Sequence, residues 1–161
     1  PSVILVDPKY DHNVGSVVRA ASCFGVKQIL FTGDRVKLDE GQRLPREERM
    51  RGYKDVQLIQ ADRPFDAFEN VVPVAIELMP GSENLAEFEH PENAVYVFGP
   101  EDGSIPSVIR QHCHRFVTIP SFHCTNLAAA VYIVLYDRVL KAGWNGAPYP
   151  SVAGEERGWS S

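Results

Sequence analysis

Short, almost entirely apolar runs constrain this chain most, because they recur along its length with helix-like segments between them. They predict buried strands at residues 3–6, 29–31, 56–59, 72–76, 94–98 and 116–119. Strands that are apolar on both faces are typical of a parallel sheet covered on both sides. The sequence therefore predicts the α/β class, with a mostly parallel sheet and helices on both of its faces.

Apolar positions at three- and four-residue steps indicate a helix over residues 14–24, with Asn13 as its expected N-cap. Shorter helices are expected at residues 44–50, 64–69, 84–88 and 105–112. The last helix, over residues 125–141, has almost no polar face until its end. A helix that is apolar all round is buried on more than one side. This pattern favours a subunit interface, and a central helix within a monomer is the alternative.

We expect a single domain over residues 1–142 and a flexible tail over residues 143–161, which is rich in Gly, Pro and Ser. No apolar run approaches the ~20 residues that span a bilayer, and no secretion signal opens the chain. The three cysteines cannot all pair. These features predict a cytoplasmic protein without a membrane segment.

The formal net charge of −5 argues against a nucleic-acid partner, but the charge is unevenly distributed. Residues 34–54 hold seven Lys and Arg against five Asp and Glu, whereas residues 62–102 hold ten acids and one base. A locally basic segment can contact phosphates although the whole chain is acidic. The alternative for this segment is a solvated helix whose bases pair with Glu47 and Glu48.

Three loop-to-helix segments, at residues 7–19, 97–106 and 118–130, each follow a predicted strand. Ligands of open parallel sheets bind beyond the carboxyl ends of the strands, so these segments are candidates for a site. Arg19 interrupts an apolar helix, and it is either a surface arginine or a ligand for a phosphate or an alkoxide. Glu101 and Asp102 lie near the start of a predicted helix, and helix capping alone explains one of these acids. A helix cap is likewise the alternative to a functional role for Thr125 or Asn126.

Together and in this order, the three segments resemble the motifs of the SpoU (TrmH-type) RNA 2′-O-methyltransferase family of the SPOUT superfamily. The matching positions are Asn13, Arg19, Phe24 and Gly25; Gly99, Pro100, Glu101, Gly103, Ile105 and Pro106; and Ile119, Pro120, Asn126, Leu127, Tyr136 and Asp137. Cys124 and Thr125 depart from the family pattern in the third motif, and Ser104 stands where the second motif often has glycine.

The resemblance implies transfer of a methyl group from S-adenosylmethionine to a ribose 2′-hydroxyl of RNA, with tRNA favoured over rRNA because the chain is as short as the minimal TrmL-type members. It also implies a C-terminal deep trefoil knot and a homodimer whose partner completes the active site. The expected cofactor-binding residues are Leu78, Gly99, Pro100, Glu101, Gly103, Ser104, Ile119, Ser121, Thr125, Leu127 and Ala128.

The catalytic residues that the resemblance implies are Arg19, Asn13, Glu101 and Asn126. A guanidinium stays protonated in proteins and is a poor base, so we expect Arg19 to bind a phosphate and to stabilise the developing alkoxide. No metal is expected. The candidates for contacts with the RNA backbone are Arg35, Lys37, Arg43, Arg46, Arg49, Arg51 and Lys54.

Three other classes of protein are alternatives to this resemblance. A Rossmann-type nucleotide binder is disfavoured because no Gly-x-Gly-x-x-Gly loop follows the first strand. A non-catalytic RNA- or nucleotide-binding relative of the same fold stays open, since Cys124 departs from the motif. A zinc site is disfavoured because its candidate ligands lack paired spacing. These candidates are His112, Cys113, His114, His123 and Cys124.

Overall fold

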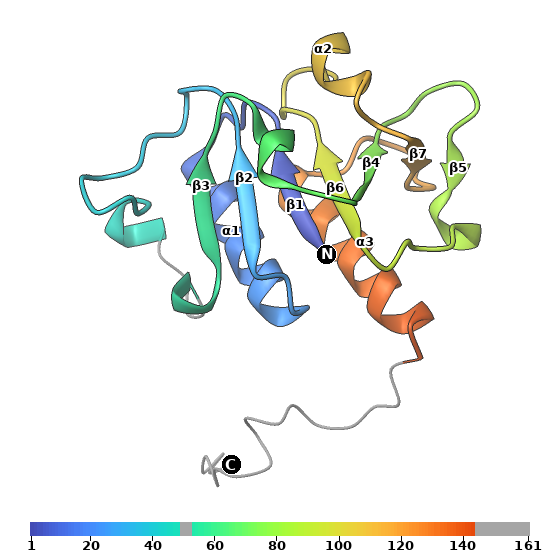
Figure 1. The fold of residues 1–161 in the computed structure, drawn as a ribbon, viewed down its shortest axis with the longest axis horizontal. Helices are drawn as coiled ribbons and strands as arrows, with labels where there is room; N and C mark the ends of the chain where they lie inside the picture. Colours follow the sequence, from blue (N-terminus) through green and yellow to red (C-terminus); the bar gives the residue numbers. More distant parts are fainter. Residues whose placement is uncertain (49–52, 144–161) are drawn as a thin grey trace, which may run out of the picture.

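The computed structural model describes residues 1–48 and 53–143, and within these residues all strands form one parallel sheet (Figure 1). The strand order is β3-β2-β1-β6-β4-β7-β5. The strands are β1 (Ser2–Leu5), β2 (Gln28–Phe31), β3 (Gln57–Gln60), β4 (Val72–Ile76), β5 (Glu83–Asn84), β6 (Ala94–Phe98) and β7 (Arg115–Thr118). The predicted α/β class with a parallel sheet is confirmed.

Helices α1 (Asp11–Cys23) and α3 (Leu127–Lys141) pack against each other on one face of the sheet, behind it in Figure 1. The other face is covered by the short helix α2 (Ser107–Arg110) and by the 3-10 turn η3 (Pro64–Ala67), together with their flanking loops. The remaining 3-10 turns of the described chain are η1 (Arg46–Glu48), η2 (Tyr53–Asp55) and η4 (Leu85–Glu87). No helix in these residues is long and apolar enough to cross a membrane.

Alternate residues of each central strand enter two separate cores. In β6, Tyr96 and Phe98 join the core beneath α1 and α3, whereas Val95 and Val97 join the core on the opposite face. Side chains alternate along a strand, so covering both faces requires apolar residues at every position. This requirement explains the continuous apolar runs of the sequence.

Several of the predicted helices are wrong in kind or length. Residues 64–69 and 84–88 contain 3-10 turns, the helix at 105–112 shortens to α2, and residues 44–48 contain only η1. Such short segments gain few intrahelical bonds for the cost of the first turn, so packing on the sheet decides their form. Residues 49 and 50 of the predicted helix lie outside the described residues.

Helix α1 begins at Asp11, with Tyr10 as its N-cap residue, so the prediction of Asn13 as N-cap is wrong. Asn13 lies inside the helix and is buried, and its side chain bonds to other loops instead. Of the two N-cap candidates for α3, Thr125 and Asn126, the structure has Asn126. Its side-chain oxygen accepts hydrogen bonds from the amides of Ala128 (2.9 Å) and Ala129 (3.3 Å).

A polar network that we call the rear network holds the C-terminal end of α3 to the segment before β6. Its members are His90, Tyr96, Asp137, Arg138 and Lys141. The two ring nitrogens of His90 lie 2.6 Å from the Tyr96 hydroxyl and 2.7 Å from the Asp137 carboxylate. Burial lowers the pKa of His90, and the attraction of Asp137 offsets this effect only in part. A neutral imidazole satisfies both contacts, since it accepts from Tyr96 and donates to Asp137.

Candidate functional site

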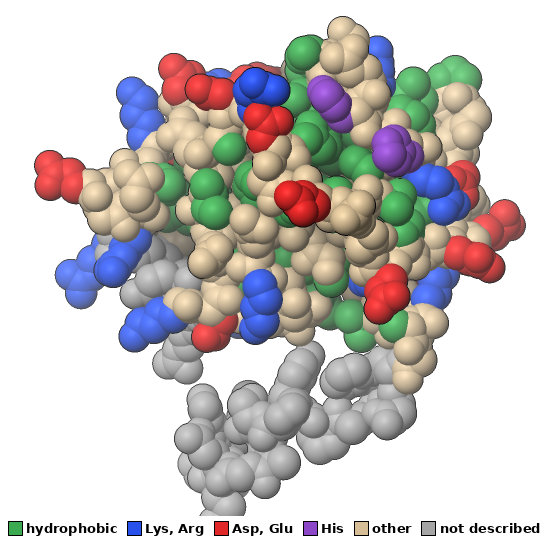
Figure 2. All heavy atoms as spheres, in the orientation of Figure 1, with side chains coloured by type: hydrophobic (Ala, Val, Ile, Leu, Met, Phe, Trp, Pro, Cys, Tyr) green, Lys and Arg blue, Asp and Glu red, His purple; other side chains and the backbone are tan. Residues whose placement is uncertain are grey.

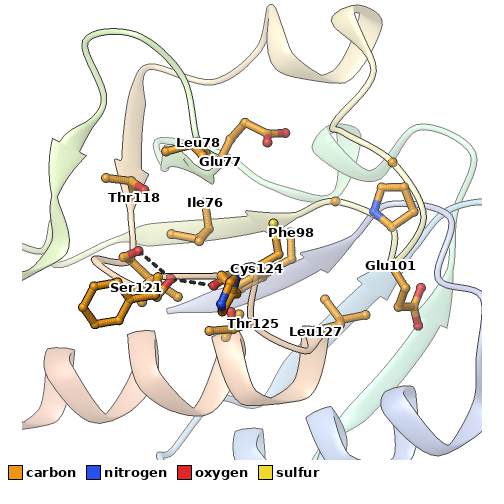
Figure 3. Close-up of a pocket in the computed structure, with 17 residues that line it drawn as sticks. Ile76, Glu77, Leu78, Phe98, Glu101, Thr118, Ser121, Cys124, Thr125 and Leu127 are labelled. Carbon is orange, nitrogen blue, oxygen red and sulfur yellow. Dashed lines mark hydrogen bonds between the residues drawn. The ribbon is translucent and has the colours of Figure 1, made fainter.

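The loops that follow β1, β4, β6 and β7 meet at one edge of the sheet, because the carboxyl ends of parallel strands all lie there. Three of these loops, with the start of α3, enclose a cavity of about 510 Å³ (Figure 3). This volume is within the range of small-molecule sites, roughly 300–1,000 Å³. The cavity therefore lies at the edge of the sheet where the sequence predicted a ligand site.

The cavity has an apolar floor and a polar rim. Strand-end residues Ile76 and Phe98 and the first turns of α3 supply the floor, and Figure 3 shows Thr125 and Leu127 on the α3 side. The rim includes Ser121, whose Oγ lies 2.8 Å from the His123 carbonyl oxygen. An apolar lining with a few polar groups is typical of sites for small-molecule ligands.

Most of the expected cofactor-binding residues line this cavity, and two do not. Those that line it are Leu78, Gly99, Pro100, Glu101, Gly103, Ile119, Ser121, Thr125 and Leu127. Ser104 and Ala128 lie beside it without lining it. The residues that sequence reasoning missed are Ile76, Glu77, Phe98, Thr118, Phe122, His123, Cys124 and Ala130. The rule that ligands sit at strand ends could have found Ile76, Glu77, Phe98 and Thr118.

Three motif residues that are distant in sequence form a chain of hydrogen bonds, which we call the front network. The Asn13 Nδ2 donates to Glu101 Oε1 (2.8 Å), and the Asn126 Nδ2 donates to Asn13 Oδ1 (3.0 Å). Because Asn126 also caps α3, the network joins the β6–α2 loop, α1 and α3. It places three of the four expected catalytic residues together.

The Glu101 carboxylate is held in its charged form by the protein itself. It also accepts hydrogen bonds from the amides of Lys9 (2.8 Å) and Tyr10 (3.4 Å). Partial burial raises the pKa of Glu101, but the bonds from Asn13 and from the backbone outweigh burial, and the pKa falls below its ordinary value. Glu101 is therefore an orienting anion and a poor proton donor.

Arg19 does not line the cavity and is exposed on α1. Burial raises the pKa of the Tyr132 hydroxyl on α3, and the positive charge of Arg19 offsets part of this rise. Arg19 therefore lies near Tyr132. The structure thus separates Arg19 from the other expected catalytic residues of the same chain. It places Arg19 on the surface that α1 and α3 share.

The β6–α2 loop is hydrogen-bonded to the loop that follows β4. The Glu77 carboxylate accepts a hydrogen bond from the Ile105 amide (2.9 Å). A Cβ at Gly99 would lie 3.2 Å from the nitrogen and from the Cγ1 of Ile105, so a larger residue here would press on Ile105 and this turn favours glycine. The loop therefore presents its backbone to the cavity in a defined position.

The described Lys and Arg residues from β2 to the end of η2 are exposed, but the first of them is paired within the chain. Arg35 pairs with Asp102 (2.8 Å) and Asp7 (3.2 Å), so its guanidinium is engaged within the chain. Lys37, Arg43, Arg46 and Lys54 are exposed, and Arg49 and Arg51 lie outside the described residues. Figure 2 shows Lys and Arg side chains at its left side, where Figure 1 draws this segment. Contacts between these side chains and RNA stay a prediction.

Among residues 1–48 and 53–143, no group of three or more His, Cys, Asp and Glu side chains could hold a metal ion. The candidates for a zinc site are dispersed. Cys113 is buried, and burial raises the pKa of its thiol to about 11, whereas His123 and Cys124 are exposed at the cavity.

The fold and the cavity define an α/β protein with a cavity of small-molecule size at the carboxyl edge of a parallel sheet. The model of the SpoU rRNA Methylase family matches residues 1–136, and the chain belongs to this family. The chain is 26% identical over 157 residues to the tRNA (cytidine-2′-O-)-methyltransferase TrmJ of Methanocaldococcus jannaschii. That match covers 84% of this chain and 66% of the relative.

Two solved structures share the fold. The TrmH/SpoU tRNA modifying enzyme of A. aeolicus has a TM-score of 0.73 at 20% identity, over 88% of this chain and 76% of that one. The SpoU methyltransferase AviRb of Streptomyces viridochromogenes, solved with AdoMet, has a TM-score of 0.68 at 17% identity. That match covers 88% of this chain and 60% of AviRb, so the chain spans only part of some of its relatives.

Proposed function

We propose that this protein transfers a methyl group from S-adenosylmethionine to a ribose 2′-hydroxyl of RNA. The observation that carries the proposal is the front network, which joins all three family motifs at the mouth of a nucleoside-sized cavity. The relative TrmJ is a tRNA 2′-O-methyltransferase by name, and the family is one of RNA methylases. Selection of a 2′-hydroxyl requires RNA as the substrate.

The residues of the cavity fit S-adenosylmethionine. The apolar floor suits an adenine ring, and the rim and the backbone of the β6–α2 loop offer polar partners. The lining includes carboxylates and, among the described residues, no Lys or Arg, which suits a ligand that carries positive charge. When bound, this cofactor supplies an electrophilic methyl group on a positively charged sulfur. The chain itself must bind and orient the ligand and exclude water from it.

Arg19 activates the acceptor ribose from the partner subunit in this proposal. Its exposure on α1, away from the cavity of its own chain, supports a role across an interface. A guanidinium donates up to five hydrogen bonds and can hold a phosphate while stabilising a developing alkoxide. Asn13 and Asn126 position the ribose and the α3 loop, and Glu101 orders both through its hydrogen bonds.

A homodimer formed through α3 is part of the same proposal. Ala129, Ile133, Tyr136 and Leu140 are exposed at three- and four-residue steps, so they form one stripe along the helix. Phe24, which directly follows α1, packs edge-on against Tyr136, with ring centroids 6.4 Å apart, and extends the stripe. Exposed apolar surface of this kind marks an interaction site. A second copy of the chain would cover it and bring Arg19 to the other cavity.

The substrate is tRNA rather than rRNA in this proposal, and the names of the TrmJ and A. aeolicus relatives support that choice. The exposed bases Lys37, Arg43, Arg46 and Lys54 contact its phosphates. The trefoil knot, the single domain over residues 1–142 and the cytoplasmic location stay predictions of the family resemblance and of the sequence.

The test is transfer of labelled methyl from S-adenosylmethionine to total tRNA and, separately, to ribosomal RNA. We expect label in tRNA and a loss of about 100-fold or more in Arg19→Ala, since a donor to a developing oxyanion is removed. Arg63→Ala, which removes an exposed arginine paired with Asp66, is the matched control and should keep full activity. Near-normal turnover by Arg19→Lys would exclude a bidentate role. Cofactor binding without label in either pool would indicate a non-catalytic relative.

A further inference from the structure

Two carboxylates, Glu77 and Glu101, line the cavity, and in the described part of the chain no Lys or Arg side chain lines it. We propose that Glu77 is a specificity-determining residue whose carboxylate favours the positively charged sulfonium of the cofactor over the neutral thioether that remains after methyl transfer. This inference rests on the proposed function. It assigns to Glu77 a role that the family motifs do not contain.

The protein uses the two carboxylates differently. Glu101 accepts three hydrogen bonds, which involve both of its oxygens and compensate its charge within the chain. The Oε2 of Glu77 accepts a single bond, from the Ile105 amide, and no donor among the described residues reaches its Oε1. Glu77 therefore keeps an oxygen and most of its negative charge for a ligand.

Glu77 is also held in place before any ligand arrives. Its amide donates to the Val117 carbonyl (3.0 Å), and the Ser82 hydroxyl donates to its carbonyl (3.1 Å). Figure 3 shows its side chain above the cavity, on the side opposite Thr125 and Leu127. A fixed charge stabilises an opposite charge without the cost of reorganisation.

The charge of the cofactor changes by one unit when the methyl group leaves. Sulfur is a cation before transfer and a neutral thioether afterwards, because the electron pair of the broken bond stays with it. A carboxylate attracts the first form, and it attracts it more strongly in a partly enclosed cavity than in bulk water. Glu77 would thus favour entry of the charged donor and release of the spent product.

The test compares three ligands of nearly equal shape by calorimetric titration of the full chain and of Glu77→Gln. These are S-adenosylmethionine, S-adenosylhomocysteine and sinefungin, in which a carbon that bears an ammonium group replaces the methylated sulfur. We expect Glu77→Gln to weaken the two cationic ligands by about tenfold and the neutral one by less than about twofold. Glutamine keeps an oxygen that can accept from Ile105, and an unchanged unfolding midpoint will establish that the loop is intact.

The matched control is Glu87→Gln, which removes the same charge at an exposed position of η4 and should leave all three affinities unchanged. Equal weakening of the three ligands in Glu77→Gln, or no change in any of them, would overturn the assignment of Glu77. Binding of none of the ligands to the native chain would overturn both the assignment and the proposed function. If the three ligands bind in the expected pattern but no methyl group is transferred to any RNA, the proposed function alone would be overturned.

Discussion

The two ends of α3 are both tied to the rest of the chain by polar side chains, but in different surroundings. At its start, the front network of Asn126, Asn13 and Glu101 lies beside the cavity. At its end, the rear network connects His90 to Tyr96 and Asp137 away from the cavity, and the His90 side chain is 5% exposed. We therefore expect similar hydrogen bonds to position the site at one end of the helix and to stabilise the fold at the other.

The largest effect on activity is expected from a substitution that breaks the front network. Asn13→Ala removes the amide that joins Glu101 to Asn126, so the two loops lose their common position. We expect kcat/KM for methyl transfer to fall about 100-fold, since small misplacements of reacting groups cost this much. The free energy of unfolding should fall by only about 1 kcal/mol, as for an ordinary hydrogen bond. A loss of stability that accounts for the whole loss of activity would contradict the comparison.

The second largest effect is expected on stability, from a substitution that breaks the rear network. Asp137→Ala leaves His90 and Lys141 without their carboxylate partner, which lies 2.7 and 2.8 Å from them. We expect the free energy of unfolding in urea to fall by about 2–3 kcal/mol, somewhat below the cost of breaking a fully buried pair. The folded fraction should keep its kcat. Asp62→Ala, at an exposed position, is the control and should change neither quantity.

The smallest effect is a dependence of stability on pH that sharpens the comparison. The pKa of His90 is lowered by burial, so the unfolded chain binds more protons than the folded chain below the ordinary histidine pKa of about 6.5. The contribution of His90 is thus fully present above that pH and is lost as the pH falls through the lowered pKa. His90→Gln should flatten this slope in urea unfolding, whereas His114→Gln, at an exposed position, should preserve it. An unchanged slope in His90→Gln would assign the dependence to other groups.

The parts of the fold that follow from local patterns could be predicted from the sequence. The bounds of β4 and β6 are as predicted, because a strand buried on both faces leaves an unbroken apolar run. The two-residue strand β5 was missed, since Glu83 and Asn84 carry no such run. The short helices were overestimated because their form depends on packing.

The site was predictable mainly through the order of the three motifs. Spacing alone gave Asn13 the role of a cap, because its partners are 88 and 113 positions away and only the fold brings them near. Glu77 was missed for a similar reason: its importance comes from the charge balance of a cavity that three loops and α3 build together. The rear network was missed as well, since His90 and Asp137 are 47 positions apart.

The order of the strands has a consequence for the chain while it is being synthesised. The first three strands pair as β3-β2-β1. The other edge of β1 stays unpaired until β6 is synthesised, because the residues of β6 leave the ribosome much later. Until then, a half-built sheet presents an unpaired edge and uncovered apolar faces, which are the features that promote aggregation of nascent proteins. We expect the growing chain to depend on general chaperones until Ala94–Phe98 has emerged, and to bind its ligand only after α3 is complete.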